Sequence, residues 1–499
     1  MFGGQSHVNF DNDLGKFVEP TRQEVIKEFK QFKNTFASQE AFDEFVENKV
    51  VARVHQAMQG IVYNLNTMHS RAGSQVPFSS LNIGLPENKD AALVCQAFLE
   101  EYDKGLGKGE QPIFPNIIFR VKKGLNRGEG APYEYLFKLA CKIAAHRMNP
   151  TFMNMDADFN LKYYEKGIYP ATMGCRTYIC SNVNGLEGPA RRGNNAPVTM
   201  DIVRIGIEAN KDIDLFFEKL EDIIALAVKS CLHRHETLCQ LKVKDLPFVA
   251  GQHLMMGSEG LNENDSIEPI LRNGSYGIGF VGLAECVYAL ISKKYGIDKE
   301  ATELGYRIVR KIRKCTDEAT KTFKLNFGCY ASPAETVCGK LLKADRERFG
   351  VIEGVTDKEY YTNSFHVPVG QSISIIDKIN VEADMHKLCN SGHISYIEFD
   401  GNPSPGTIEK ILNYAYDNTN ISYMGINFHM RYCKDCGKTV YENLNKCPHC
   451  GGEHIQGISR VTGYLSLDER FGEAKQHERK DRISHETGER VYRNTRKSM

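Results

Sequence analysis

Four cysteines near the C-terminal end constrain the fold of this chain more than any other feature. They form two C-x2-C pairs separated by ten residues: Cys433, Cys436, Cys447 and Cys450. Each pair can direct two thiolates at one ion, and Gly437 and Gly451, directly after the pairs, suit the positive-φ turn of such a knuckle. Four thiolates complete a tetrahedral shell. We therefore predict a structural zinc site that adds folding energy and leaves no open position for chemistry.

Other interpretations of the cysteine cluster stay open, namely an iron site of the rubredoxin type and a redox pair without metal. A zinc ribbon can also be a nucleic-acid module, but Asp435, Glu442 and Glu453 balance its basic residues, and no aromatic stacking surface is evident. We expect a structural clamp without direct nucleic-acid binding.

The net charge of the chain argues against a binding partner that is attracted by the long-range electrostatic field of the whole protein. Lys plus Arg and Asp plus Glu number 63 each, so neither a polyanion nor an acidic membrane surface is attracted. No apolar stretch is long enough for a membrane helix, and the opening residues lack the features of a secretory signal. We expect a cytoplasmic protein without membrane contact, whose 15 cysteines are mostly reduced thiols.

Apolar spacing predicts helices that alternate with short strands, which indicates an α/β architecture. The expected helices are two within residues 21–58 and one each over 89–102, 132–147, 213–232, 283–294, 299–320 and 334–342. The expected strands cover 76–81, 113–121 and 198–205. Residues 172–195 show neither period and are rich in Gly, Asn and Arg around Cys175, which is typical of a functional loop.

Two motifs in this framework resemble those of a known family. Gly463 follows the cysteine pairs within RVTGYL, and this segment resembles the glycyl-radical loop of the anaerobic, class III ribonucleotide reductases. Glycine suits a stored radical because its α-carbon can flatten and share the unpaired electron with the flanking amide nitrogen and carbonyl. MGCRT, residues 173–177, resembles the finger loop of that family, which makes Cys175 the thiyl relay. Further segments similar to the family are 66–82, 192–209, 273–285, 332–335 and 358–369.

The resemblance implies a fold and a domain organisation. We expect a ten-stranded α/β barrel of the ribonucleotide reductase and pyruvate formate-lyase type in residues 1–425, a four-cysteine zinc ribbon in 426–456, and a glycyl-radical loop with a C-terminal tail in 457–499. The similarity starts part-way through the family's sequence. We therefore expect the barrel to be incomplete at its N-terminus, without the first strands and the second active-site cysteine of formate-using members.

The resemblance also implies an activity. A separate radical-SAM activating enzyme would take a hydrogen atom from Gly463, and the radical would then oxidise Cys175 to a thiyl. The thiyl would remove the 3′ hydrogen of a ribonucleoside triphosphate, which would be reduced to a deoxyribonucleotide for DNA synthesis. Relatives are homodimers, so we expect the same here. The electron donor, formate or a thiol, and the effector specificity stay open.

Further site residues follow from the resemblance. Ser79, Ser80 and Ser332 are candidates for binding phosphate, with ordinary turn and cap serines as the alternative. Glu335 is a candidate proton donor to the departing 2′ hydroxyl, with a first-turn helix glutamate as the alternative. Asp201 lies where relatives often carry an asparagine or a cysteine that helps to position the reductant. A carboxylate there would repel formate.

Two other functions are alternatives to this one. A glycyl-radical enzyme of the pyruvate formate-lyase or dehydratase kind would lack the four-cysteine ribbon. An inactive or partner-dependent fragment could act as a zinc-ribbon binding protein. We also expect the basic tail, residues 475–497, to be a solvated surface or a dock for the activating enzyme. Gly463→Ala is expected to abolish the radical while leaving the fold and the zinc intact.

Overall fold

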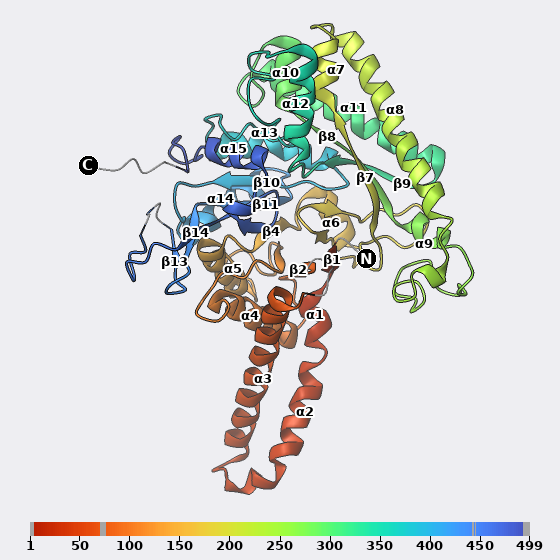
Figure 1. Ribbon diagram of the computed structural model, residues 1–499. Helices are drawn as coiled ribbons and strands as arrows, with labels where there is room; N and C mark the ends of the chain where they lie inside the picture. The colour runs from red at the N-terminus through yellow and green to blue at the C-terminus, as the bar shows by residue number, and fades with distance from the viewer. Residues whose placement is uncertain (1–3, 70–75, 442–443, 445, 493–499) are drawn as a thin grey trace.

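The larger sheet of the molecule contains most of its parallel strands. The computed structural model describes residues 4–69, 76–441, 444 and 446–492 (Figure 1). The sheet has the order β1-β2-β3-β4-β11-β10, in which β1 to β4 run parallel, β11 is antiparallel to β4, and β10 is parallel to β11. Its strands are β1 (Gly4–His7), β2 (Phe78–Ile83), β3 (Asn116–Val121), β4 (Thr151–Asn154), β10 (Ser395–Glu398) and β11 (Tyr423–Asn427). Parallel strands joined through helices confirm the predicted α/β class.

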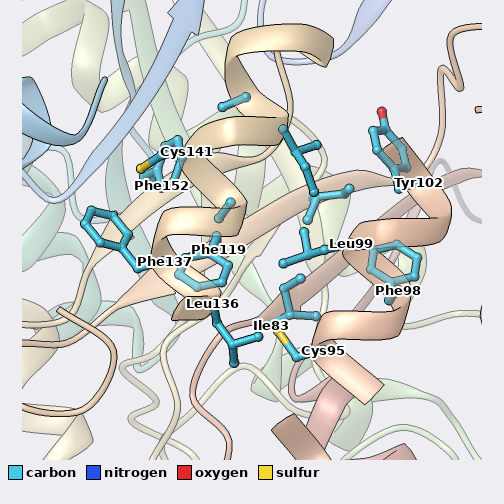
Figure 2. Packing of buried hydrophobic residues seen from close by; sticks show 14 of the residues in the cluster. Ile83, Cys95, Phe98, Leu99, Tyr102, Phe119, Leu136, Phe137, Cys141 and Phe152 are labelled. Carbon is cyan, nitrogen blue, oxygen red and sulfur yellow. The ribbon is translucent and has the colours of Figure 1, made fainter. Parts of the chain in front are cut away.

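Helices cover this sheet because a parallel crossover needs a long connection. They are α1 (Phe10–Gly15), α4 (Lys89–Lys104), α5 (Glu134–Arg147) and α14 (Pro405–Asn418). Figure 2 shows the part of the core in which α4 and α5 pack on the strands, with Phe98 and Leu99 from α4 and Phe137 from α5. The rings of Phe119, Phe137 and Phe152 lie 6.3–6.5 Å from one another, with an edge-to-face arrangement in two of the three pairs.

A second sheet has three parallel strands in the order β7-β8-β9. They are β7 (Asn194–Asp201), β8 (Ser275–Val281) and β9 (Asn326–Ala331). The helices of this region are α7 (Ile202–Glu208), α8 (Ile213–Leu238), α9 (Glu268–Asn273), α10 (Leu283–Ile291), α11 (Lys299–Phe323), α12 (Val337–Phe349) and α13 (Ile375–Leu388). Apart from α9, whose buried Ile270 and Leu271 belong to a smaller cluster, these elements bury a second hydrophobic core, separate from the first.

A helical hairpin projects from the body at the bottom of Figure 1. It consists of α2 (Val18–Phe29), a 3-10 turn at Lys30–Thr35, and α3 (Gln39–Thr67). Ser38 caps α3, since its hydroxyl oxygen accepts a hydrogen bond from the Ala41 N–H at 3.2 Å. Two helices in residues 21–58 were predicted, and the structure confirms them.

Two short hairpins lie between these parts and carry the residues of interest. The first pairs β5 (Thr172–Met173) with β6 (Thr177–Tyr178). The second belongs to a four-stranded sheet of order β13-β12-β14-β15, made of β12 (Met430–Cys433), β13 (Thr439–Val440), β14 (Ile455–Arg460) and β15 (Leu465–Leu467). The remaining helices are α6 (Asp158–Tyr164), α15 (Glu473–Asp481) and the 3-10 turns Val243–Asp245 and Asp468–Arg470.

The expected strand over 198–205 is wrong in its second half. β7 ends at Asp201 and α7 begins at Ile202, because the Asp201 carboxylate accepts a hydrogen bond from the Arg204 N–H at 3.2 Å and caps the helix. The apolar residues on both sides of the cap form one short run. Periodicity cannot distinguish a strand from a helix in such a run.

The expected solvated tail is wrong in part, because one face of α15 and the residues after it are buried, whereas Lys480 and residues 486–490 are exposed. Lys475, Glu478, Arg482 and His485 are all buried. Glu478 pairs with Arg482 at 3.3 Å and also with Lys475, so the charges of α15 and the following residues are matched inside the protein. Residues 493–499 of the tail lie outside the described residues.

The ten-stranded α/β barrel stays a prediction. Within the described residues, Gly392, which precedes β10, forms isolated bridges to Tyr330 of β9 and to Thr177 of β6, and so links the second sheet to the β5–β6 hairpin. Among the same residues, none of the helices combines the length and the apolar character needed to cross a membrane.

Phe137→Ala tests the packing of the first core. Phe137 is 1% exposed, so its removal leaves a cavity and should lower the free energy of unfolding by about 3–5 kcal/mol in chemical denaturation. Phe248 is 71% exposed, and Phe248→Ala should change the same quantity by less than about 0.5 kcal/mol. Equal effects from the two variants would contradict this account of the core.

Candidate active site and metal centre

Cys175 lies at the tip of the β5–β6 hairpin. Gly174 supplies the turn with a φ of +62°. The Gly174 N–H donates to the Ser80 hydroxyl oxygen at 3.0 Å, and the Asn116 amide donates to the Gly174 carbonyl at 3.3 Å. Ser80 of β2 and Asn116 of β3 therefore anchor the turn that carries Cys175 to the larger sheet.

The base of the same hairpin is held by Asn82 of β2. The Thr172 N–H donates to the Asn82 side-chain oxygen at 3.1 Å, and the Asn82 amide donates back to the Thr172 carbonyl at 3.2 Å. The Ser6 hydroxyl also donates to the Thr172 carbonyl, at 2.8 Å. These hydrogen bonds fix both the position and the orientation of the hairpin relative to the larger sheet.

Gly463 lies at the tip of the β14–β15 hairpin, in the turn between Arg460 and Leu465, which pair with each other. A methyl group placed on Gly463 would lie 2.0 Å from the Cβ atom and 2.5 Å from the Cα atom of Cys175. Both positions are far inside van der Waals contact. The structure therefore brings the two predicted radical residues into direct contact, and the space between them requires glycine.

This contact corrects one expectation. Gly463→Ala cannot leave the local structure intact, because the added methyl group would overlap with Cys175 and the backbone of one hairpin must move. Loss of a radical in that variant would mix a chemical cause with a steric one.

Glu335 belongs to the loop between β9 and α12 and faces the glycine hairpin. Its carboxylate accepts hydrogen bonds from the Thr462 hydroxyl at 3.1 Å and from the Tyr464 hydroxyl at 3.0 Å. These two residues flank Gly463. Since α12 begins at Val337, Glu335 precedes the helix and is not a first-turn residue.

The surroundings of Cys175 keep its sulfur protonated. Burial raises the pKa of the thiol, and Glu335 adds to this, although the Arg176 guanidinium acts in the opposite direction. A neutral S–H group can give up a hydrogen atom, whereas a thiolate has none to give.

The three serines predicted to bind phosphate are all buried. Ser80 contacts the cysteine turn as described above, and the Ser332 and Thr199 hydroxyls share a hydrogen bond of 2.8 Å. The Ser79 hydroxyl has no hydrogen-bond partner among the described residues. Phosphate binding by these serines stays a prediction.

Asp201 lies beside two other charged groups. The Arg204 guanidinium is 3.9 Å from its carboxylate and 2.7 Å from that of Asp345, which is fully buried. Burial and the neighbouring Asp345 carboxylate raise the pKa of Asp201 to about 7. Asp201 is therefore partly neutral near neutral pH, which weakens the repulsion of formate expected from a permanent carboxylate.

Asp201→Asn should change how stability depends on pH. Since the folded pKa is raised above the unfolded value, native Asp201 keeps its proton to higher pH, and its contribution is lost as pH rises from about 4 to about 7. In the unmodified protein, the free energy of unfolding should decrease from about pH 5 to about pH 8. In Asp201→Asn this decrease should be smaller, by on the order of a few kcal/mol. Asp212→Asn, at the exposed cap of α8, is the matched control. An unchanged pH profile in Asp201→Asn would contradict the assignment.

The four cysteines converge on one point, as predicted. Their sulfur atoms all lie within 4.8 Å of one another. The Sγ atoms of Cys433 and Cys450 are 3.7 Å apart, and those of Cys436 and Cys447 are 3.6 Å apart. Gly437 and Gly451 have φ values of +75° and +74°, which confirms the predicted turns. Four thiolates at these separations suit a tetrahedral zinc ion.

The cluster and the glycine hairpin share one sheet. β12 pairs with β14 so that Cys433 lies opposite Ile455, and β14 pairs with β15. A metal held by the cysteines would therefore fix one end of the sheet whose other end carries Gly463.

Cys447→Ser should remove the metal. A serine hydroxyl is a poor zinc ligand and breaks the shell of four, so metal analysis of the purified protein should show zinc in the unmodified chain and little in the variant. Cys315→Ser, which changes a half-buried cysteine outside the cluster, should retain zinc. Full zinc content in Cys447→Ser would rule out this centre.

Two arginines of the site were not singled out from the sequence, although both lie in the quoted motifs. Arg176 follows Cys175 directly, and Arg460 precedes Gly463 by three residues. Each is 1% exposed. A charged residue that directly adjoins a radical motif is a usable signal. Only the structure shows that both side chains turn inward.

Comparisons with known proteins agree on one family. Residues 1–485 match the family described as anaerobic ribonucleoside-triphosphate reductase. The anaerobic ribonucleoside-triphosphate reductase of Escherichia coli K12 is 30% identical over 97% of this chain and 68% of its own length. That of Haemophilus influenzae is 31% identical over 97% of this chain and 69% of its own length. That of bacteriophage T4 is 28% identical over 97% of this chain and 80% of its own length.

Solved structures agree on the fold. The anaerobic ribonucleotide reductase from Thermotoga maritima in complex with dATP and CTP matches with a TM-score of 0.67 at 17% identity, over 95% of this chain and 74% of that chain. Fold and site together define an α/β enzyme of the ribonucleotide reductase type. The chain belongs to the anaerobic ribonucleoside-triphosphate reductase family, and by homology its activity is that of this oxidoreductase.

Proposed function

We propose that this chain reduces ribonucleoside triphosphates through a radical stored on Gly463 and relayed by Cys175. One observation carries the proposal, namely the contact in which a methyl group on Gly463 would lie 2.0 Å from the Cys175 Cβ atom. A hydrogen atom can pass only between groups in contact. The two residues lie on different hairpins and are 288 positions apart in the sequence, so their contact has no local cause.

The proposed steps balance as follows. An activating enzyme removes one hydrogen atom from the α-carbon of Gly463, and the resulting radical takes the hydrogen atom of the Cys175 thiol. The thiyl takes the 3′ hydrogen of the ribose, and the 2′ hydroxyl leaves as water after protonation. A reductant supplies two electrons, and Cys175 returns its hydrogen atom to C3′. Overall, two electrons and two protons are consumed and one water is released.

Glu335 is proposed as the acid for the departing hydroxyl. It accepts hydrogen bonds from Thr462 and Tyr464, which places its carboxylate beside the radical hairpin. A general acid must lie within hydrogen-bond reach of the group that it protonates. Ser79, Ser80 and Ser332 are proposed to contact the substrate phosphates, and Asp201 to influence the choice of reductant.

The remaining parts of the proposal concern assembly and partners. The Thermotoga relative was solved with dATP and CTP, which supports nucleotides as substrate and effector here. We propose a radical-SAM activating enzyme as a partner, a homodimer as the assembly, and a structural zinc at the cysteine cluster. The strands of both sheets are proposed to form part of a ten-stranded barrel, with a catalytic region in 1–425, a zinc ribbon in 426–456 and a radical loop with the tail in 457–499.

An isotope experiment tests the radical on Gly463 without the steric problem of alanine. The zinc-loaded chain is incubated anaerobically with a radical-SAM activating enzyme of this family, S-adenosylmethionine and a reductant. The single α-hydrogen that stays on a glycyl radical should split the EPR signal into a doublet. The same protein made with α-deuterated glycine should give a narrow line without that splitting.

Cys175→Ser provides the matched control. It should keep the doublet and lose ribonucleotide reduction, because an alcohol O–H bond is too strong to pass on its hydrogen atom. A doublet with full turnover in this variant would overturn the role of Cys175. A folded, zinc-loaded chain that gives no radical would favour the partner-dependent or binding-protein alternative.

A further inference from the structure

The carbonyls on both sides of Gly463 are held by buried arginines. An N–H group of Arg460 donates to the Gly463 carbonyl at 3.1 Å, and an N–H group of Arg176 donates to the Thr462 carbonyl at 2.6 Å. The first carbonyl follows the α-carbon of Gly463, and the second belongs to the peptide group that precedes it. Both peptide groups attached to this α-carbon therefore receive a hydrogen bond from a cation.

These arginines differ from the other buried cations nearby. Arg482 and Lys475 are each paired with a glutamate. Among the described residues, no carboxylate lies within ion-pair distance of Arg176 or Arg460. Burying a cation without an anion is costly, so the hydrogen bonds that each guanidinium makes to carbonyl and amide oxygens must offset this cost.

Other contacts hold both guanidinium groups in place. Arg460 donates to the Asn427 side-chain oxygen at 2.8 Å and also to the Met148 carbonyl. The guanidinium carbons of Arg176 and Arg460 each lie 5.9 Å from the centroid of the Tyr396 ring. The Tyr396 hydroxyl donates to the same Thr462 carbonyl as Arg176.

A neutral histidine completes the surroundings of Arg176. His366 Nε2 lies 3.5 Å from the Arg176 guanidinium, and its Nδ1 atom lies 3.5 Å from Glu382. Burial lowers the pKa of His366 to about 4, so that its ring is uncharged at neutral pH. The ring can then face the cation without repulsion, which leaves the positive charge of Arg176 directed at the glycine hairpin.

A radical on Gly463 would draw electron density toward the carbonyl that follows it, because the unpaired electron delocalises over the amide nitrogen, the α-carbon and the carbonyl. A cationic donor on that oxygen strengthens its accepting character. Because both guanidinium groups are almost fully buried, water screens this effect less than it would at a surface.

We propose that Arg460 is a positioning residue that stabilises the radical form of Gly463 through its carbonyl, and that Arg176 holds the preceding peptide group so that the α-carbon stays flat against Cys175. The proposal deepens the proposed function and rests on it.

Arg460→Gln tests the inference. It removes the charge and keeps a neutral amide, so the balance between the Gly463 radical and the Cys175 thiyl should move away from glycine by about tenfold. The radical should decay faster under anaerobic conditions. With less spin on the carbonyl, more stays on the α-carbon, so the splitting of the EPR doublet should widen. Arg460→Lys keeps a charged donor and should restore both properties in part.

Arg147→Gln is the matched control. Arg147 is also a buried arginine that donates to backbone carbonyls, those of Asp103 and Gly109. It lies outside the glycine hairpin, so its variant should leave the doublet splitting unchanged. An identical splitting and lifetime in Arg460→Gln and the unmodified protein would overturn the inference, as would an equal change in Arg147→Gln.

A measurement on the unmodified sequence tests the same inference without a substitution, so misfolding of a variant cannot affect its result. In protein made with 15N-labelled arginine, electron–nuclear double resonance should detect weak coupling of the radical to a guanidinium nitrogen. A clear glycyl doublet without this coupling would overturn the role of Arg460 while leaving the proposed function in place. Absence of any doublet would instead defeat the proposed function.

Discussion

The close approach of Gly463 to Cys175 is the constraint on which the rest of the site depends. The two residues lie on hairpins that belong to different sheets, so their contact requires both supports to be correct at once. Asn82 and Ser80 hold the cysteine hairpin on the larger sheet. The cysteine cluster and β12 hold the glycine hairpin. Space, and not an unusual backbone angle, is what requires a glycine at 463.

A second layer of buried charge secures the glycine hairpin from behind. Arg482, after α15, donates to the Arg460 carbonyl at 2.9 Å and pairs with Glu478. Arg482 also lies 3.8 Å from Glu398 of β10. Ion pairs that are buried in this way are costly to break one partner at a time. The buried part of the tail is therefore a structural part of the site, although Lys480 and residues 486–490 are exposed.

Much of the fold and the central site residues could be predicted from the sequence. Helices with long apolar periods, such as α4, α8 and α11, were found because one buried face repeats along many turns. Gly463, Cys175 and the four cysteines were found because their motifs are specific in composition, spacing and order along the chain. The end of β7 at Asp201 was missed, since a cap within a short apolar run leaves no period to read. The burial of Arg176, Arg460 and the tail was missed because charge predicts exposure until a partner is seen.

The shared sheet of the cysteine cluster and the glycine hairpin has a consequence for how sequences of this kind can diverge. Between Cys450 and Gly463 the chain passes only the short turn 451–454 before it enters β14, which leaves little slack to absorb a change in length. One residue inserted into or deleted from β14 would slide the strand along β12 and bring Thr462 or Tyr464 to the cysteine tip. The number of residues along this stretch is therefore fixed by the strand pairing, independently of which side chains it carries. The fold therefore fixes the number of residues between the second cysteine pair and the glycine.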